Sequence, residues 1–128
     1  MTARLRIGGY QGEQSVHTRA VRLLMETLRG RLGDRVTIAF EPDISARGRK
    51  VADLLALVEH GDLDLCYFSS SYLAERVGAL AALDIPFAFA ERADTHRRLS
   101  GELGRLLKDD IAKHGMPDVG LSEAIGLA

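Results

Sequence analysis

The sequence alternates between strand-like and helix-like segments, and this order constrains the fold more than any other feature. Short β-rich runs are separated by longer stretches in which apolar residues recur at helical spacing. Strands that alternate with helices pair in parallel, because each crossover helix returns the chain to the same end of the sheet. We therefore expect an α/β fold with a mostly parallel sheet and helices on both faces.

The bounds of the expected elements follow from these patterns and from glycine, serine and proline positions. The predicted strands cover residues 5–9, 36–40 and 63–68, with a fourth candidate at 117–121. The predicted helices cover the stretch after Ser15 and residues 49–60, 72–83 and 92–114, the last as one helix or two. The residues expected to begin, break or end these helices are Ser15, Gly30, Gly33, Gly61, Gly101 and Gly104. Residues 83–89 are expected to be extended, because Pro86 disfavours a helix before it.

Composition narrows the possible functions. The chain has 128 residues, 46% of them hydrophobic, which suits one compact unit or one lobe of a larger protein. Its 17 basic and 18 acidic residues give a net charge of −1, so we expect no attraction to nucleic acid. No apolar run is long enough to span a membrane. The first residues, MTARLRIGGY, lack an apolar export signal, so we expect either a cytoplasmic protein or a sequence that begins after a removed signal.

Two predicted strands end in segments that could hold a ligand. The first ends in GGYQGEQS, and the third stops at Ser69 and the two serines after it. The carboxyl ends of parallel strands face the same way, and ligands of open α/β sheets bind beyond those ends. Serine hydroxyls and the unpaired N–H groups of a helix start suit an anion. The serines could instead only cap a helix, and Tyr10 and Gln11 could be exposed turn residues.

Two basic side chains are further candidates for contact with an anion. His17 falls in the first turn of the first predicted helix, where it could contact an anion or be solvated. Arg49 belongs to a small basic cluster with Arg47 and Lys50, which is either a solvated surface or an anion contact. Glycine motifs for nucleotides and His or Cys spacings for metals are absent from the sequence, so we expect no cofactor and no metal.

Catalysis by a nucleophile is the third possibility that the residues leave open. Ser69, Ser70 or Cys66 could act as the nucleophile with His17 as the base, but no GxSxG motif supports a nucleophile elbow. Cys66 lies inside a predicted buried strand, where a thiol is typically inert. The residues alone leave nucleophilic catalysis open.

Three stretches of the sequence resemble one known family in order and spacing. They are IGGYQGEQSVHTRAVRLLMETL, GRKVADLLALVEHGDLDLCYFSSSYLAERV and ALDIPFAFAERADTHRRLSGELGRLL. The chain is similar, from about Leu5 to Met116, to the amino-terminal lobe of DctP-type solute-binding proteins of tripartite ATP-independent periplasmic (TRAP) transporters. The resemblance implies a two-lobed periplasmic-binding-protein-like fold of type II, closing on a small organic acid that a membrane permease takes up with an ion gradient. It implies no enzymatic activity.

The resemblance also implies which positions contact the solute. The implied ligand-binding residues are Tyr10, Gln11, His17, Arg49, Phe68, Ser69 and Ser70. Residues 1–128 would form the amino-terminal lobe, in the periplasm, and the arginine that clamps the carboxylate would belong to a second lobe absent from this sequence. An isolated lobe with an exposed sheet edge could self-associate. The alternative is a stand-alone cytoplasmic α/β domain that senses a ligand.

Overall fold

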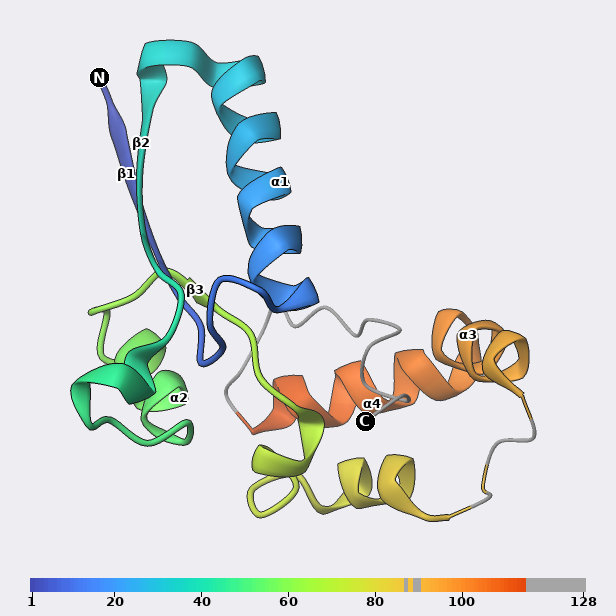
Figure 1. Cartoon of the computed structure of the whole chain (residues 1–128). Coiled ribbons are helices and arrows are strands. Elements are labelled where there is room, and N and C mark those ends of the chain that lie inside the picture. The colour runs from blue at the N-terminus through green and yellow to red at the C-terminus, as the bar shows by residue number, and fades with distance from the viewer. Residues whose placement is uncertain (87, 89–90, 115–128) are drawn as a thin grey trace. The chain divides into compact units, whose positions relative to one another are not determined.

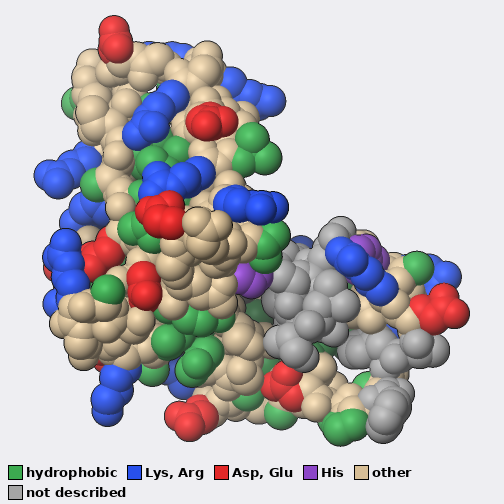
Figure 2. Space-filling model, viewed as in Figure 1, with side chains coloured by type: hydrophobic (Ala, Val, Ile, Leu, Met, Phe, Trp, Pro, Cys, Tyr) green, Lys and Arg blue, Asp and Glu red, His purple; other side chains and the backbone are tan. Residues whose placement is uncertain are grey.

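The computed structural model describes residues 1–86, 88 and 91–114 of the chain. The chain divides into two compact units, Met1–Phe68 and Ser69–Ala128, which are considered separately below (Figure 1). No helix in the described part of the chain is both long and apolar enough to cross a membrane. Acidic and basic side chains are interspersed on the visible face of the first unit (Figure 2), as the small net charge leads one to expect.

The first unit is built on a parallel sheet of three strands in the order β2-β1-β3. The strands are β1 (Ala3–Gly8), β2 (Val36–Glu41) and β3 (Leu65–Cys66). Two α-helices connect them, α1 (Val16–Leu32) and α2 (Asp53–Glu59), together with the short 3₁₀ helices η1 (Gly33–Arg35) and η2 (Ile44–Arg47). The predicted α/β class with a parallel sheet is confirmed.

The central strand β1 organises this unit. It pairs with β2 along its whole length and with β3 at Ile7 and Gly8 (Figure 1). The crossover from β1 to β2 and the crossover from β2 to β3 run in opposite directions along the sheet, so right-handed connections place α1 on one face of the sheet and α2 on the other. Ile7 is 1% exposed, and Leu54 of α2 is fully buried. A Cβ at Gly8 would lie 2.5 Å from the Leu63 side chain, so the glycine allows this close packing.

Helix α1 begins as predicted and ends at one of the two predicted glycines. Ser15 is its N-cap, and its hydroxyl accepts a hydrogen bond from the His17 N–H at 3.1 Å. Gly33 follows the last helical residue and has a φ of 54°, a conformation that favours glycine. Gly30 lies inside the helix, so its predicted role as a terminator is wrong.

Helix α2 and strand β3 are shorter than predicted. The Asp53 side chain accepts a hydrogen bond from the Lys50 N–H at 2.8 Å, which forms a turn where the helix was expected to begin. Gly61 follows the helix with a φ of 82°, which confirms it as the terminator. Strand β3 pairs through two residues, and its last residue, Cys66, lies opposite Gly8, the last residue of β1.

The second unit contains two 3₁₀ helices, η3 (Ser70–Tyr72) and η4 (Gly78–Asp84), followed by α3 (Arg92–Ser100) and α4 (Glu102–Lys113). The predicted helix over 72–83 is wrong. Gly78 interrupts it, and buried Val77 and Leu80 are held in short turns. The predicted extended stretch 83–89 is wrong at its start, since η4 continues to Asp84. Residues 87, 89 and 90 and the candidate strand 117–121 lie outside the described residues.

The last predicted helix is two helices, α3 and α4, that meet at Gly101. Gly104 is buried in the first turn of α4, where a Cβ would lie 1.7 Å from the Leu99 carbonyl oxygen. Such an overlap of non-bonded atoms excludes any side chain. The corner between the two helices therefore depends on Gly104 as well as on the break at Gly101.

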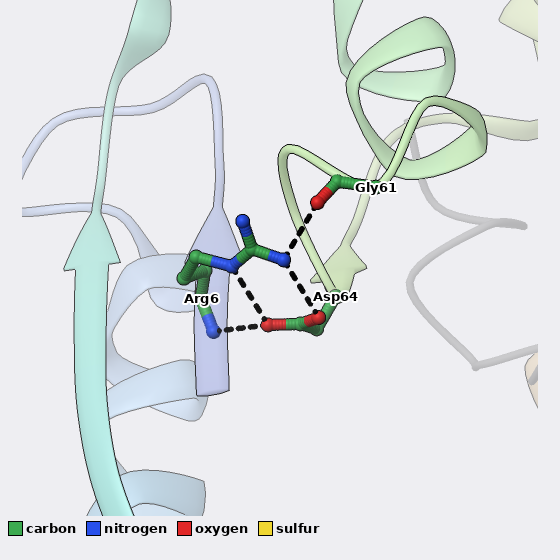
Figure 3. Close-up of polar contacts among 3 residues, drawn as sticks. All are labelled: Arg6, Gly61 and Asp64. Carbon is green, nitrogen blue, oxygen red and sulfur yellow. Dashed lines mark hydrogen bonds and ion pairs between the residues drawn. The ribbon is translucent and has the colours of Figure 1, made fainter. Parts of the chain in front are cut away.

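An ion pair joins β1 to the segment that leads into β3 (Figure 3). The Arg6 guanidinium donates to both Asp64 oxygens at 3.1 Å and to the Gly61 carbonyl at 2.6 Å. The Asp64 carboxylate also accepts the Arg6 backbone N–H at 2.7 Å, and the Asp64 N–H donates to the Arg6 carbonyl at 2.9 Å. These hydrogen bonds fix the register in which β3 approaches β1.

This ion pair predicts a dependence of stability on pH. Hydrogen bonds from the Arg6 side chain and backbone lower the pKa of Asp64 below its usual value. A lowered folded-state pKa stabilises the protein above the usual Asp pKa of about 4, and this contribution is lost as the pH falls through the folded-state value. We expect Asp64→Asn to lower the free energy of unfolding at pH 7, and the difference from wild type to shrink below about pH 4.

Urea denaturation across this pH range measures the difference directly. Glu26→Gln, on the exposed surface of α1, is the matched control and should follow the wild type at every pH. An equal loss of stability in Asp64→Asn at pH 7 and at pH 3 would contradict the assigned role of the charge.

Candidate functional site

The loop after β1 is fastened to the segment after β2 by main-chain hydrogen bonds. The Gly9 N–H donates to the Glu41 carbonyl at 2.9 Å, and the Gly9 carbonyl accepts the Ile44 N–H at 3.0 Å. The Gln11 N–H donates to the Pro42 carbonyl at 3.1 Å. These bonds hold the loop in one conformation at the carboxyl end of the sheet, where α/β proteins bind ligands.

Three rings gather at this edge of the sheet. Tyr67 follows β3, and its ring centroid lies 5.4 Å from that of Tyr10 and 5.3 Å from that of His17. The planes are tilted by 40° and 31° respectively, a geometry typical of favourable ring pairs. The predicted convergence of the first and third strand ends therefore occurs within the first unit, through a residue from each end and one from the start of α1.

The ring of Tyr67 packs against the backbone of Gly9. A Cβ at Gly9 would lie 2.7 Å from Cε1 of Tyr67 and 2.7 Å from the Pro42 carbonyl oxygen. Both distances are shorter than van der Waals contact. The second glycine of the GGYQG turn is therefore required by close packing on two sides, and its φ is not left-handed.

The Tyr67 hydroxyl is buried and makes no hydrogen bond of normal geometry within the described residues. Burial raises the pKa of the Tyr67 phenol, while the nearby Thr18 hydroxyl and Tyr10 backbone act in the opposite direction. The Thr18 side chain is fully buried, and its hydroxyl donates to the Gln11 carbonyl at 2.9 Å. The start of α1 is thus attached to the loop by a side chain that water cannot reach.

The start of α1 is electrostatically suited to an anion. It carries no acidic residue in its first turn, and the helix dipole makes this end partly positive. Glu13 is the acidic residue of the loop, and Arg22 pairs with it and lowers its pKa. The Gln11 side-chain oxygen accepts from the Ser15 hydroxyl, which leaves the Gln11 NH₂ group as a donor with no partner among the described residues.

The structure brings some of the predicted site residues together and leaves others apart. Tyr10, Gln11 and His17 lie in one group, and Phe68 is the next residue after Tyr67. Arg49 is exposed in the turn before α2, and its guanidinium makes no ion pair or hydrogen bond with the described residues. It therefore makes no ion pair or hydrogen bond with the Tyr10 group.

Ser69 and Ser70 open the second unit. Ser69 precedes η3, but its side chain makes no capping hydrogen bond; its hydroxyl lies 2.9 Å from the Ser71 hydroxyl. Ser70 is 5% exposed, and its hydroxyl has no hydrogen-bond partner within the described part of the chain. Helix capping therefore does not account for these two serines.

Cys66 lies in β3, and burial raises the pKa of its thiol to about 11. A thiol with this pKa stays protonated near neutral pH, and the thiol form is a poor nucleophile. Among the described residues, no three His, Cys, Asp or Glu side chains are grouped so that they could hold a metal ion.

Sequence reasoning missed Tyr67. The sequence pattern predicts only that it belongs to the strand at residues 63–68. The strand register pairs Gly8 with Cys66, which puts Tyr67 beside Gly9 of the GGYQG turn. A large aromatic residue level with a glycine on the neighbouring strand is the signal that could have identified it.

The sequence matches the model of the family described as bacterial extracellular solute-binding protein, family 7 (DctP), over residues 7–123. No curated protein matches the sequence.

Three solved structures with a similar fold are TRAP periplasmic solute-binding proteins. The protein from Ochrobactrum anthropi has a TM-score of 0.78 at 15% identity and covers 89% of this chain. The protein from Sulfurospirillum deleyianum, with bound succinate, has a TM-score of 0.77 at 18% identity and 88% coverage. The protein from Roseobacter denitrificans, with bound β-D-glucuronate, has a TM-score of 0.76 at 21% identity and 88% coverage. This chain spans 35%, 36% and 37% of their respective lengths.

The packing at Gly9 predicts that replacing Gly9 with alanine destabilises the protein, whereas the same replacement of Gly12 in this loop does not. Gly9→Ala forces its new methyl group against the Tyr67 ring and the Pro42 carbonyl, so we expect a loss of about 1–3 kcal/mol in the free energy of unfolding. Gly12→Ala is the matched control, because a Cβ there meets nothing within 4 Å. Urea denaturation of both variants measures the difference, and equal stabilities would show that the Tyr67 ring does not occupy this position.

Proposed function

The chain belongs to family 7 of the bacterial extracellular solute-binding proteins, and on this basis we propose that it captures a small carboxylate solute for uptake through a TRAP transporter. The observation that carries the proposal is the group of Tyr10, His17 and Tyr67 at the carboxyl edge of a parallel sheet. This is the edge at which open α/β sheets bind ligands. The Tyr67 ring offers apolar contact, and the Tyr10 hydroxyl and the His17 imidazole are the groups that could hydrogen-bond a small polar molecule.

The charges around this group favour an anionic solute. The start of α1 is partly positive, the Gln11 NH₂ group is an available donor, and the carboxylate of Glu13 is occupied by Arg22. Similar structures hold β-D-glucuronate, β-D-galacturonate, succinate and diglycerolphosphate, all of which are anions at neutral pH. Arg49, Phe68, Ser69 and Ser70 remain proposed contacts from the family pattern.

We propose that residues 1–128 correspond to the amino-terminal lobe of a two-lobed binding protein. The support is that similar structures are matched over little more than a third of their length. Closing a second lobe over the solute would supply the other wall of the site, including a carboxylate-clamping arginine. The proposed location is the periplasm, and the proposed partner is the TRAP permease. The raised pKa of Cys66 argues against nucleophilic catalysis in this role.

Calorimetric titration tests the solute class. We expect at least one of D-glucuronate, D-galacturonate and succinate to bind, and D-glucose, which lacks a carboxylate, not to bind. Because one lobe offers a single wall, we expect a Kd of about 1 mM. His17→Ala should weaken binding roughly tenfold through loss of an anion contact.

His60→Ala is the matched control for this titration. His60 is exposed at the end of α2, so its replacement should leave the affinity unchanged. Equal binding of glucose and the three carboxylates, or binding of none of them, would contradict the proposed solute class.

The intact mass of the protein from its native cell, with its compartment, tests the proposed domain organisation. We expect a periplasmic species of more than twice 14.0 kDa, because the similar structures are that much longer than this chain. A cytoplasmic species of 14.0 kDa would contradict the transport function and favour a ligand-sensing domain.

A further inference from the structure

Tyr67 is outside the set of residues that the family pattern assigns to the solute. We propose that Tyr67 is a positioning residue of the solute site, whose ring fixes the orientations of Tyr10 and His17 without itself binding the solute through its hydroxyl. The inference rests on the proposed function, and its test separates the two. It explains why an aromatic residue stands at the end of β3, beside Gly9.

The first support is that Tyr67 contacts two rings from different elements. Tyr10 lies in the loop after β1, and His17 lies in the first turn of α1. The Tyr67 ring lies within 5.4 Å of the first and 5.3 Å of the second, measured between centroids. One side chain on a third segment therefore restrains both rings at once.

The second support is that Tyr67 is itself held in place. Its ring edge lies against the Gly9 backbone, which leaves no room for even one added carbon atom. The Gly9 backbone is in turn hydrogen-bonded on both sides, to Glu41 and to Ile44. A ring fixed against a fixed backbone can transmit that rigidity to the side chains packed on it.

The third support concerns the hydroxyl. It is buried, and a Cβ at Gly9 would lie 3.0 Å from it, so the hydroxyl faces the backbone of the loop and is enclosed by protein. The role of Tyr67 is therefore carried by its ring. It follows that phenylalanine should replace it and that a flexible aliphatic side chain should not.

Loss of the ring should act on binding through entropy. Tyr10 and His17 would regain rotamer freedom, and ordering them again would weaken solute binding by about tenfold. The loss of a fixed orientation of Tyr10 and His17 should also be detectable without solute, because an aromatic ring at this distance shifts the NMR resonances of protons on its neighbours.

The experiment compares Tyr67→Leu with Tyr67→Phe in the whole chain. We expect Tyr67→Leu to move the Hδ2 and Hε1 resonances of His17 and the ring resonances of Tyr10 toward values for mobile side chains, while Tyr67→Phe keeps them near wild type. Glu26→Leu, at an exposed position of α1 nine residues beyond His17, is the control and should leave them unchanged. Dispersed ¹H–¹⁵N spectra show that each variant is folded.

Calorimetric titration then tests whether the orientation of Tyr10 and His17 affects solute binding. The ligand is whichever of D-glucuronate, D-galacturonate or succinate binds the wild type. We expect Tyr67→Leu to weaken binding about tenfold and Tyr67→Phe by less than about threefold. In the background of His17→Ala, Tyr67→Leu should cost less than it does alone, because the two residues act together.

Two results would overturn the positioning role. One is unchanged His17 and Tyr10 resonances in Tyr67→Leu. The other is wild-type affinity in Tyr67→Leu when those resonances have moved. A wild type that binds none of the three carboxylates overturns the proposed function instead, whatever the resonances of the variants show.

Discussion

The pairing of β1 with both of its neighbours is the constraint on which the rest of the first unit depends. Strand β1 is the only described strand with a partner on each side, and both partners run parallel to it. Parallel pairing brings the segments that follow all three strands to one edge of the sheet. Gly8 ends this strand and Gly9 follows it, and these two glycines leave room for the Leu63 and Tyr67 side chains where larger residues would exclude them. The close approach of β3 to β1 is thus a property of the sequence at the end of β1.

The pairing of the strands, together with the hydrogen bonds between the segments that follow them, makes the site rigid. The loop after β1 is hydrogen-bonded to the segment after β2, and the buried Thr18 hydroxyl ties the start of α1 to the same loop. Arg6 and Asp64 join β1 to the segment that enters β3 at the opposite end of their short pairing. A group of rings held by three segments, at the positive end of a helix, is suited to a small anion without any large rearrangement of this unit.

Local signals in the sequence predicted those features that depend on a few neighbouring residues. The cap at Ser15, the end of α2 at Gly61 and the break at Gly101 each follow from the chemistry of one residue. The helix predicted over 72–83 was wrong because its apolar spacing also suits short 3₁₀ turns that bury Val77 and Leu80. Tyr67 was missed because its role depends on the register between two strands far apart in the sequence, which no local pattern contains.

The central claim is that the carboxyl ends of β1 and β3 form the solute site together with the start of α1. An NMR titration of the ¹⁵N-labelled chain with the carboxylate that binds it tests this claim most directly. The account predicts that the amide resonances that shift belong mainly to residues 9–18 and 66–68, in the three segments that carry Tyr10, His17 and Tyr67. Shifts confined to α3 and α4, or spread evenly over the chain, would contradict it.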